Sequence, residues 1–161
     1  MNPVWLQKKL IEPKCLSQTA KNLRAGGKTL ATLNGSFDLL HAGHLFILHE
    51  AAKQADILLV ALNSDASIQR YKGASRPIIS LQHRLEMIAA IEFVDFVTWF
   101  EEDDPRSFLR CVSPEVHVNG AEYGSECIEA ETVRSLGARL YLVERIPALA
   151  SSQIVSKIRC G

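Results

Sequence analysis

Short apolar segments alternate with segments of helical spacing along most of the chain, and this alternation limits the possible folds more than any other feature. The apolar segments, which we predict to be buried strands, are residues 29–33, 57–62, 96–99, 116–118 and 140–143. Strands that alternate with helices at this spacing are typical of right-handed β-α-β units, in which helices cover both faces of a parallel sheet. The sequence therefore predicts an α/β fold with a doubly wound, Rossmann-like parallel sheet of five strands.

Helices are expected between these strands and at both ends of the chain. The predicted helices span about residues 3–24 with a break near Pro13, 43–54, a stretch that begins after Ser80, 105–112, 126–136, and a last stretch from Ser151 or Ser152 to Arg159. Within 43–54, Leu45, Leu48 and Ala52 share one helical face, which predicts that this face is buried. The segment between the second strand and Ser80 is expected to be a loop.

Chain length and composition suit one compact globular domain. Of the 161 residues, 47% are hydrophobic and 22% are charged, a balance that can form a core without disulfides or a metal ion. We predict a domain over residues 28–161, preceded by a helical segment over residues 1–27. Lys and Arg together number 18, as do Asp and Glu. This balance argues against a broad surface for nucleic acid or for an anionic membrane.

The cysteines and the N-terminus indicate where such a chain would reside. Cys15, Cys111, Cys127 and Cys160 form no Cys-x-x-Cys pair, and no histidine cluster lies beside them in the sequence. That spacing argues against a zinc site and against a disulfide framework. The first residues lack the basic and apolar regions of a signal peptide, and no apolar run approaches the roughly 20 residues of a membrane span. We therefore expect reduced thiols, no metal held by protein ligands, and a cytoplasmic location.

The loop after the first predicted strand has the composition of an anion-binding turn. It reads Asn34-Gly35-Ser36-Phe37-Asp38-Leu39-Leu40-His41-Ala42-Gly43-His44 and leads into a predicted helix. Gly35 relieves crowding where the chain leaves the sheet, and Gly43 lets the backbone approach a ligand. The N-terminus of a helix favours a phosphate. His41 and His44 can donate to the same phosphate group, which could keep a histidine protonated near neutrality.

Two alternatives remain open for this loop. One histidine could cap the helix while the other packs against the core. Asp38 could bind a metal ion or, as we favour, could hold the loop backbone through hydrogen bonds from amides. Ligands of open α/β sheets bind beyond the carboxyl ends of the strands, where the strand order reverses. Polar residues that follow the other strands are therefore candidates for the same site.

The loop resembles the His-x-Gly-His signature of the cytidylyltransferase-like nucleotidyltransferases, and the resemblance extends over about residues 28–159. Within that superfamily the chain is most similar to the adenylyltransferase domain of bacterial ADP-heptose synthase, and it is also similar to glycerol-3-phosphate cytidylyltransferase. The resemblance implies transfer of AMP from ATP to a phosphorylated small molecule, a sugar 1-phosphate of the heptose type, with release of pyrophosphate. It also implies Mg²⁺ bound mainly through the nucleotide, and a homodimer.

The resemblance assigns roles to residues at the predicted strand ends. The implied catalytic residues are His41, His44 and Lys72. The implied nucleotide-binding residues are Asn34, Gly35, Ser36, Phe37, Gly43, His44, Arg84, Asn119, Gly120, Glu122, Tyr123, Arg145, Ser151 and Ser152. The implied acceptor-binding residues are Asp38, Asn63, Asp65 and Arg76.

Several of these residues have simpler interpretations. Lys72 could be a solvated surface lysine, although a mobile ammonium suits a phosphate that changes geometry. Arg76 precedes a proline and could hold its loop. Arg84 ends a Gln-His-Arg stretch that resembles the family's Glu-His-Arg, so it could contact phosphate, support the site, or form an ordinary helix salt bridge. Ser151 and Ser152 resemble the end of the family's Arg-Thr-Glu-Gly-Ile-Ser-Thr-Ser stretch, but one of them could simply cap a helix.

The chain departs from the heptose-type pattern in its base-recognition loop, where Asn119 replaces Lys, Ala121 replaces Gly and Glu122 replaces Asp.

Three alternative functions remain open. The first is a cytidylyltransferase acting on glycerol 3-phosphate or another alcohol phosphate. The second is a nucleotide-binding module without turnover. The third is a fragment of a class I aminoacyl-tRNA synthetase, against which the short chain and the absence of a Lys-Met-Ser-Lys-Ser-like loop argue.

Overall fold

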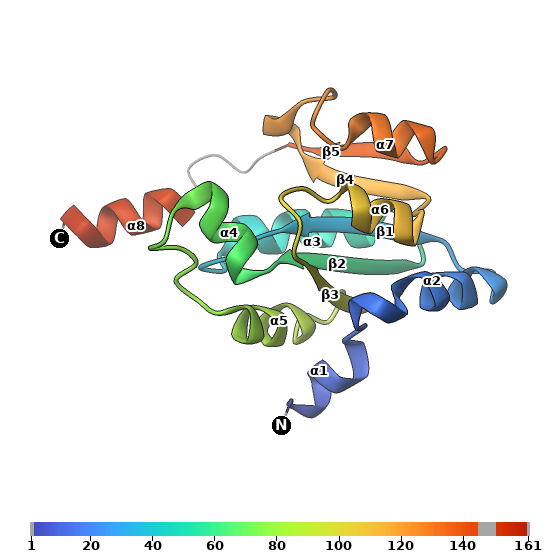
Figure 1. The fold of residues 1–161 in the computed structure, drawn as a ribbon, viewed down its shortest axis with the longest axis horizontal. Coiled ribbons are helices and arrows are strands. Elements are labelled where there is room, and N and C mark those ends of the chain that lie inside the picture. Colours follow the sequence, from blue (N-terminus) through green and yellow to red (C-terminus); the bar gives the residue numbers. More distant parts are fainter. Residues whose placement is uncertain (1, 145–150, 161) are drawn as a thin grey trace.

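A single parallel sheet forms the centre of the molecule. The computed structural model describes residues 2–144 and 151–160, and this part contains a sheet of five strands (Figure 1). The strands are β1 (Leu30–Gly35), β2 (Ile57–Asn63), β3 (Phe96–Phe100), β4 (Val116–Gly120) and β5 (Arg139–Val143). Their order is β3-β2-β1-β4-β5, and every neighbouring pair is parallel. The predicted doubly wound α/β fold is confirmed.

Helices precede the sheet and connect its strands. They are α1 (Val4–Lys9), the 3-10 turn η1 (Pro13–Cys15), α2 (Leu16–Ala25), α3 (Ala42–Ala52), α4 (Asp65–Lys72), α5 (Leu81–Ala89), α6 (Arg106–Val112), the 3-10 turn η2 (Ala121–Tyr123), α7 (Ala130–Ser135) and α8 (Ser151–Cys160). The break expected near Pro13 separates α1 from α2. Figure 1 shows α8 beyond the edge of the sheet where the strands end.

Alternation along the strands divides the core into two layers. In β2, Leu58, Val60 and Leu62 point to one face, where they pack in a cluster with Leu48 of α3 and Leu85 of α5. Successive strand residues face opposite sides, so the two residues between them belong to the other cluster.

That second cluster, on the opposite face, joins Leu59 and Ala61 to side chains of α2, α6 and α7, among them Leu109 and Val133. Each buried Leu or Val side chain contributes roughly 1.5–3 kcal/mol relative to an exposed one. Because both faces are covered, the loops at the strand ends are where polar side chains can face solvent.

The N-terminal helices pack directly on the sheet layers. Leu6 of α1 is fully buried in the first cluster, and the amide of Ile11 donates to the carbonyl oxygen of Val97 at 2.9 Å. The division at residues 27 and 28 into a helical segment and a domain stays a prediction.

Three details of the predicted helices are wrong. Leu45 is 42% exposed, whereas Leu48 and Ala51 are fully buried, so the apolar face of α3 is rotated by one position from the predicted face. The expected loop before Ser80 contains α4, which Ser64 caps by accepting from the amide of Ser67 at 3.1 Å. Helix α7 begins only at Ala130, because the residues before it form a turn beside the cleft described below.

Cys15, Cys111 and Cys127 are free thiols, as expected. The side chain of Cys160 lies outside the described residues. Among residues 2–144 and 151–160, no helix is long and apolar enough to cross a membrane.

Candidate functional site

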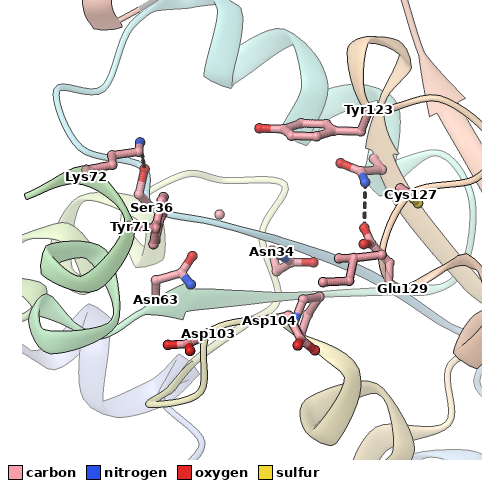
Figure 2. Close-up of a pocket in the computed structure, with 14 residues that line it drawn as sticks. Asn34, Ser36, Asn63, Tyr71, Lys72, Asp103, Asp104, Tyr123, Cys127 and Glu129 are labelled. Carbon is pink, nitrogen blue, oxygen red and sulfur yellow. Dashed lines mark hydrogen bonds between the residues drawn. The ribbon is translucent and has the colours of Figure 1, made fainter.

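A cleft of about 420 Å³ opens where the strands end. Strand order reverses between β1 and β4, the position at which open α/β sheets bind ligands. The volume lies in the range of small-molecule sites. Its walls are formed by Asn34, Gly35, Ser36, Asn63, Tyr71, Lys72, Asp103, Asp104, Pro105, Asn119, Tyr123, Cys127, Ile128 and Glu129 (Figure 2).

The loop after β1 reaches α3 through a strained backbone. Phe37 and Leu39 have φ angles of 47° and 57°, a region that costs non-glycine residues energy. Phe37 is only 5% exposed and packs in the first core cluster. Its ring was predicted to contact nucleotide, but the structure places that ring in the core. A Cβ on Gly35 would approach the Phe37 ring to 3.2 Å, which explains the small residue there.

His41 and His44 form a reciprocal cap at the start of α3. Nδ1 of His41 accepts from the amide of Gly43 at 3.1 Å, and Nδ1 of His44 accepts from the amide of His41 at 3.3 Å. Their rings stack with centroids 3.9 Å apart. A nitrogen that accepts an amide hydrogen bears no proton, so each ring is the neutral Nε2–H form.

This arrangement changes the expected chemistry of the pair. The alternative of one capping and one packing histidine is only half correct, because both rings take part in the cap. In this geometry the Nδ1 atoms accept and leave each Nε2 available as a donor. Protonation of a histidine by a bound phosphate stays a prediction. Both residues are half-buried, and neither ring is part of the wall of the cleft.

Lys72 ends α4 at the rim of the cleft, where its Nζ donates to Oγ of Ser36 at 3.2 Å (Figure 2). It was expected in a loop, and the loop begins one residue later at Gly73, whose φ is 90°. Burial lowers the pKa of the Lys72 ammonium, and the positive charge of Arg76 lowers this pKa further. The negative charge of Asp38 raises it by less than Arg76 lowers it, and Arg84 adds a smaller lowering effect. The amine is therefore easier to deprotonate than an ordinary lysine.

Asp38 fastens the loop before α5 to the loop after β1. It is 1% exposed. Its carboxylate accepts from the amide of Ile78 at 2.9 Å and from that of Ile79 at 3.0 Å, and it forms a 2.5 Å ion pair with Arg76. The favoured interpretation, backbone support, agrees with these contacts. A direct contact of Asp38 with an acceptor does not, because the side chain is enclosed.

Arg84 is fully buried and joins three loops at the strand ends. Its guanidinium donates to the carbonyl oxygens of Ser36 at 2.6 Å, Asn63 at 2.9 Å and Ile79 at 2.9 Å, and to Oδ1 of Asp65 at 2.7 Å. These four acceptors occupy the guanidinium, and the predicted contact of Arg84 with nucleotide stays a prediction. The alternative, support of the site, is what the contacts show.

Of the two predicted acceptor-binding residues at the end of β2, one lines the cleft and the other supports neighbouring elements. Asn63 lines the cleft, and its Nδ2 donates to Oγ of Ser67 at 3.1 Å. Asp65 lies outside the wall, where Oδ1 accepts from the amide of Leu81 at 2.8 Å and so caps α5. Asp65 therefore orients elements around the site, and its predicted contact with an acceptor has no support from the cleft geometry.

The loop after β4 forms the far wall. Asn119 Oδ1 accepts from the amide of Gly120 at 2.9 Å, while Nδ2 donates to Oε1 of Glu129 at 2.5 Å. A Cβ on Gly120 would lie 2.2 Å from the Glu122 carboxylate, so a larger residue there would displace the Glu122 side chain. Tyr123 is 65% exposed and borders the cleft.

Sequence reasoning missed part of the wall. The missed residues are Tyr71, Asp103, Asp104, Pro105, Cys127, Ile128 and Glu129. Burial raises the pKa of the Tyr71 hydroxyl, and a hydrogen bond with Ser36 lowers it by less. Tyr71 could have been predicted, because it is an aromatic residue next to Lys72 in the sequence. Nothing in the sequence around Glu129 indicates that it lines a site.

Three predicted residues cannot be placed. Arg145 lies outside the described residues. Ser151 and Ser152 begin α8, but their side chains also lie outside the described part, so their predicted contacts with phosphate stay predictions.

The cytidylyltransferase-like family model matches residues 32–159. The bifunctional protein HldE of Geotalea uraniireducens (strain Rf4) is 42% identical over 147 residues, which cover 91% of this chain and 30% of that protein. HldE of Desulfatibacillum aliphaticivorans is 36% identical over 99% of this chain and 33% of its own length. The chain thus spans about a third of the length of these relatives.

Two solved structures are also similar to this chain. A lipopolysaccharide core biosynthesis protein from Thermoplasma volcanium GSS1 is 30% identical with a TM-score of 0.60, over 74% of this chain and 98% of that one. A pantoate-beta-alanine ligase from Francisella tularensis has a TM-score of 0.65 at 13% identity, over 94% of this chain and 77% of that one. The second likeness concerns the fold alone.

Proposed function

The chain belongs to the cytidylyltransferase-like family, and from this premise we propose that it transfers AMP from ATP to a sugar 1-phosphate of the heptose type, with release of pyrophosphate. One observation supports this most strongly. The reciprocal His41–His44 cap begins α3 after β1, and Lys72, which ends α4 after β2, donates to Ser36 at the strand ends where the cleft opens. Helix N-terminal amides, Nε2–H donors and an ammonium all favour a polyphosphate.

The reaction needs little from the protein besides position and charge. An oxygen of the acceptor phosphate attacks the α-phosphorus and forms the new P–O bond. The bond between the α-phosphorus and the bridging oxygen breaks, and its electron pair leaves with pyrophosphate. Lys72 and the Nε2–H groups of His41 and His44 would stabilise the charge that develops on the phosphate oxygens. No side chain has to form a covalent intermediate.

The triphosphate would bring its own metal ion. Among the described residues, no group of three or more His, Cys, Asp or Glu side chains could hold one. Oxygens of the nucleotide and of water are ligands that Mg²⁺ commonly keeps. We propose that Mg²⁺ binds with the nucleotide and shields its charge.

Two findings support the choice of acceptor and nucleotide. The HldE proteins are 36% and 42% identical to the chain over most of its length. The residue pattern at 63–65, 72–73, 76–78 and Tyr123 is closer to the heptose type than to the glycerol type. The departures at Asn119 and Ala121 lie at the end of β4 and just after it, where the resemblance places base recognition. They leave Lys72 and the residues around it unchanged.

Pyrophosphate release tests the proposal directly. In a first experiment, ATP, CTP, GTP and UTP are each assayed with a panel of sugar and alcohol phosphates. In a second, the protein is incubated with D-glycero-β-D-manno-heptose 1-phosphate and equal concentrations of ATP and CTP, and the products are separated by mass. We expect an ADP-linked heptose. A CDP-linked product, or glycerol 3-phosphate as the better acceptor, would favour the cytidylyltransferase. Tight nucleotide binding without turnover on the whole panel would favour the non-catalytic module.

We also propose that the chain forms a homodimer through its N-terminal helices. Val4 and Trp5 of α1 are 62% and 50% exposed, and Met87 of the adjoining α5 is 37% exposed. Light scattering of the wild type and of Trp5→Ser tests this. A monomeric wild type at micromolar concentration would contradict it.

A further inference from the structure

The cleft has two ends of opposite chemistry. Figure 2 shows Lys72, Ser36 and Tyr71 on one side and Tyr123, Cys127 and Glu129 on the other. The first end presents an ammonium and hydroxyl groups, the second presents the Glu129 carboxylate, and Asp103 and Asp104 line the cleft from the loop between β3 and α6. If the cleft holds a nucleoside triphosphate, as the proposed function requires, the phosphates bind near Lys72 and the base lies toward Glu129, because a carboxylate repels phosphate.

Glu129 is an acidic residue buried to an unusual degree in the wall of a cleft. It is 4% exposed, yet it lines the cleft from the residue that precedes α7. An acidic side chain is rarely buried without partners. Oε1 accepts from Nδ2 of Asn119 at 2.5 Å and lies 3.6 Å from Nε2 of His117.

The partners of Glu129 are themselves fixed. His117 lies on β4 and is fully buried, and its Nδ1 is 2.9 Å from Oγ1 of Thr32 on β1. Asn119 is held through Oδ1 by the amide of Gly120. A chain of polar groups therefore runs from the core between β1 and β4 to the wall of the cleft, and it holds the carboxylate in one place.

The carboxylate is ionised near neutrality. Burial raises the pKa of Glu129, but the interaction with the His117 side chain, 3.6 Å away, and a hydrogen bond from its own backbone amide outweigh burial and leave the pKa below its ordinary value. An ionised carboxylate only accepts hydrogen bonds. It attracts a donor on a ligand and repels a second acceptor.

We infer that Glu129 selects the nucleobase by accepting a hydrogen bond from an exocyclic amino group. Adenine and cytosine carry such a group, and uracil has a carbonyl oxygen at the equivalent edge. Tyr123 and Ile128, which are 65% and 62% exposed beside Glu129, offer flat apolar surface for the base. With uracil, the carbonyl oxygen of the base would face the carboxylate without a hydrogen between them. Such unpaired acceptors strongly disfavour binding.

Calorimetry of the full chain with Mg²⁺ and ATP, CTP or UTP tests this inference without any acceptor or turnover. We expect wild type to bind ATP and CTP at least ~10-fold more tightly than UTP, the size of one unmet hydrogen bond. Glu129→Gln can donate to O4 of uracil, so the ATP-to-UTP ratio of affinities should fall to about 3-fold or less. Loss of one negative charge alone would strengthen all three nucleotides equally and leave the ratio unchanged.

Glu126→Gln is the matched control, because Glu126 pairs with the exposed Arg134 and does not line the cleft. It should keep the wild-type ratio. Glu129→Asp, which retracts the carboxylate, provides a second variant if Glu129→Gln fails to fold, and its ratio should also fall. Wild type that binds UTP as well as ATP, or a folded Glu129 variant with an unchanged ratio, would overturn the inference. Selective binding without pyrophosphate release would instead overturn the proposed function alone.

Discussion

Arg84 donates to the carbonyl oxygen of Ser36 at 2.6 Å, which ties α5 to the loop after β1 across 48 residues of sequence. The same guanidinium reaches the end of β2 and, at Ile79, the end of the loop before α5. One buried cation therefore joins three segments beside the cleft. Asp38 links two of these segments through the amides of Ile78 and Ile79, so Arg84 and Asp38 together fix their relative positions.

Removal of this cation should destabilise the protein. Arg84→Ala leaves carbonyl oxygens buried without a donor, so we expect the free energy of unfolding to fall by roughly 3 kcal/mol. The ion pair with Asp65 adds little, because that carboxylate is 40% exposed. Urea denaturation followed by circular dichroism measures the change. Arg134→Ala, at an exposed pair, should have no measurable effect, and equal stability of both variants would contradict the role of Arg84.

Strands and the first loop could be predicted from the sequence because their signals are local. The β2 segment is a run of apolar residues, and the two histidines around Gly43 follow a strand. Helix α4 was not predicted although Ser64 and Gly73 are ordinary cap residues, because its eight residues are mostly polar and look like a loop. The roles of Arg84 and Glu129 could not be found in this way, since they depend on partners up to 48 residues away.

His44 tests the charge-stabilising turn. His44→Ala removes one Nε2–H donor, so we expect kcat/KM to fall at least ~100-fold. The lost cap bond should lower stability by only about 1 kcal/mol, and the fold should survive. Steady-state kinetics with the preferred acceptor measures the effect. His83→Ala is the control, because His83 is exposed on α5, where it pairs with Glu86. Near-wild-type turnover of folded His44→Ala would remove His44 from the mechanism.

Lys72 should act mostly in the transition state. Its Nζ donates to Ser36 and lies 5.4 Å from the centroid of the Tyr71 ring. Neither contact is an ion pair, so the ammonium can move toward a phosphate whose charge is developing. Lys72→Ala is expected to lower kcat more than it weakens ATP binding. Kinetics and calorimetry on the same preparation separate the two effects. Lost ATP affinity with unchanged kcat would make Lys72 a ground-state anchor instead.

Asp38 should control the order of the segment before α5. Asp38→Asn places an amide group where the carboxylate accepts from the amides of Ile78 and Ile79. We expect hydrogen exchange at these two amides to accelerate at least ~10-fold, the size of one lost hydrogen bond. Asp103→Asn is the control, since Asp103 is 74% exposed and pairs with Arg70. Unchanged protection in Asp38→Asn would show that the segment is held by other contacts.

The loss of activity at alkaline pH should follow deprotonation of the Lys72 ammonium. Burial, then the charges of Arg76 and Arg84, lower the pKa of this group below the ordinary value of a lysine. Below that pKa the amine is protonated and can stabilise phosphate charge, and above it the charge is lost. Because the pKa is lowered, kcat should fall at a lower pH than an ordinary lysine would produce. In Lys72→Arg the guanidinium stays charged at every accessible pH, so the loss of activity should move to higher pH or vanish even if the maximal rate is reduced. A loss of activity at the same alkaline pH in both proteins would assign the titration to another group.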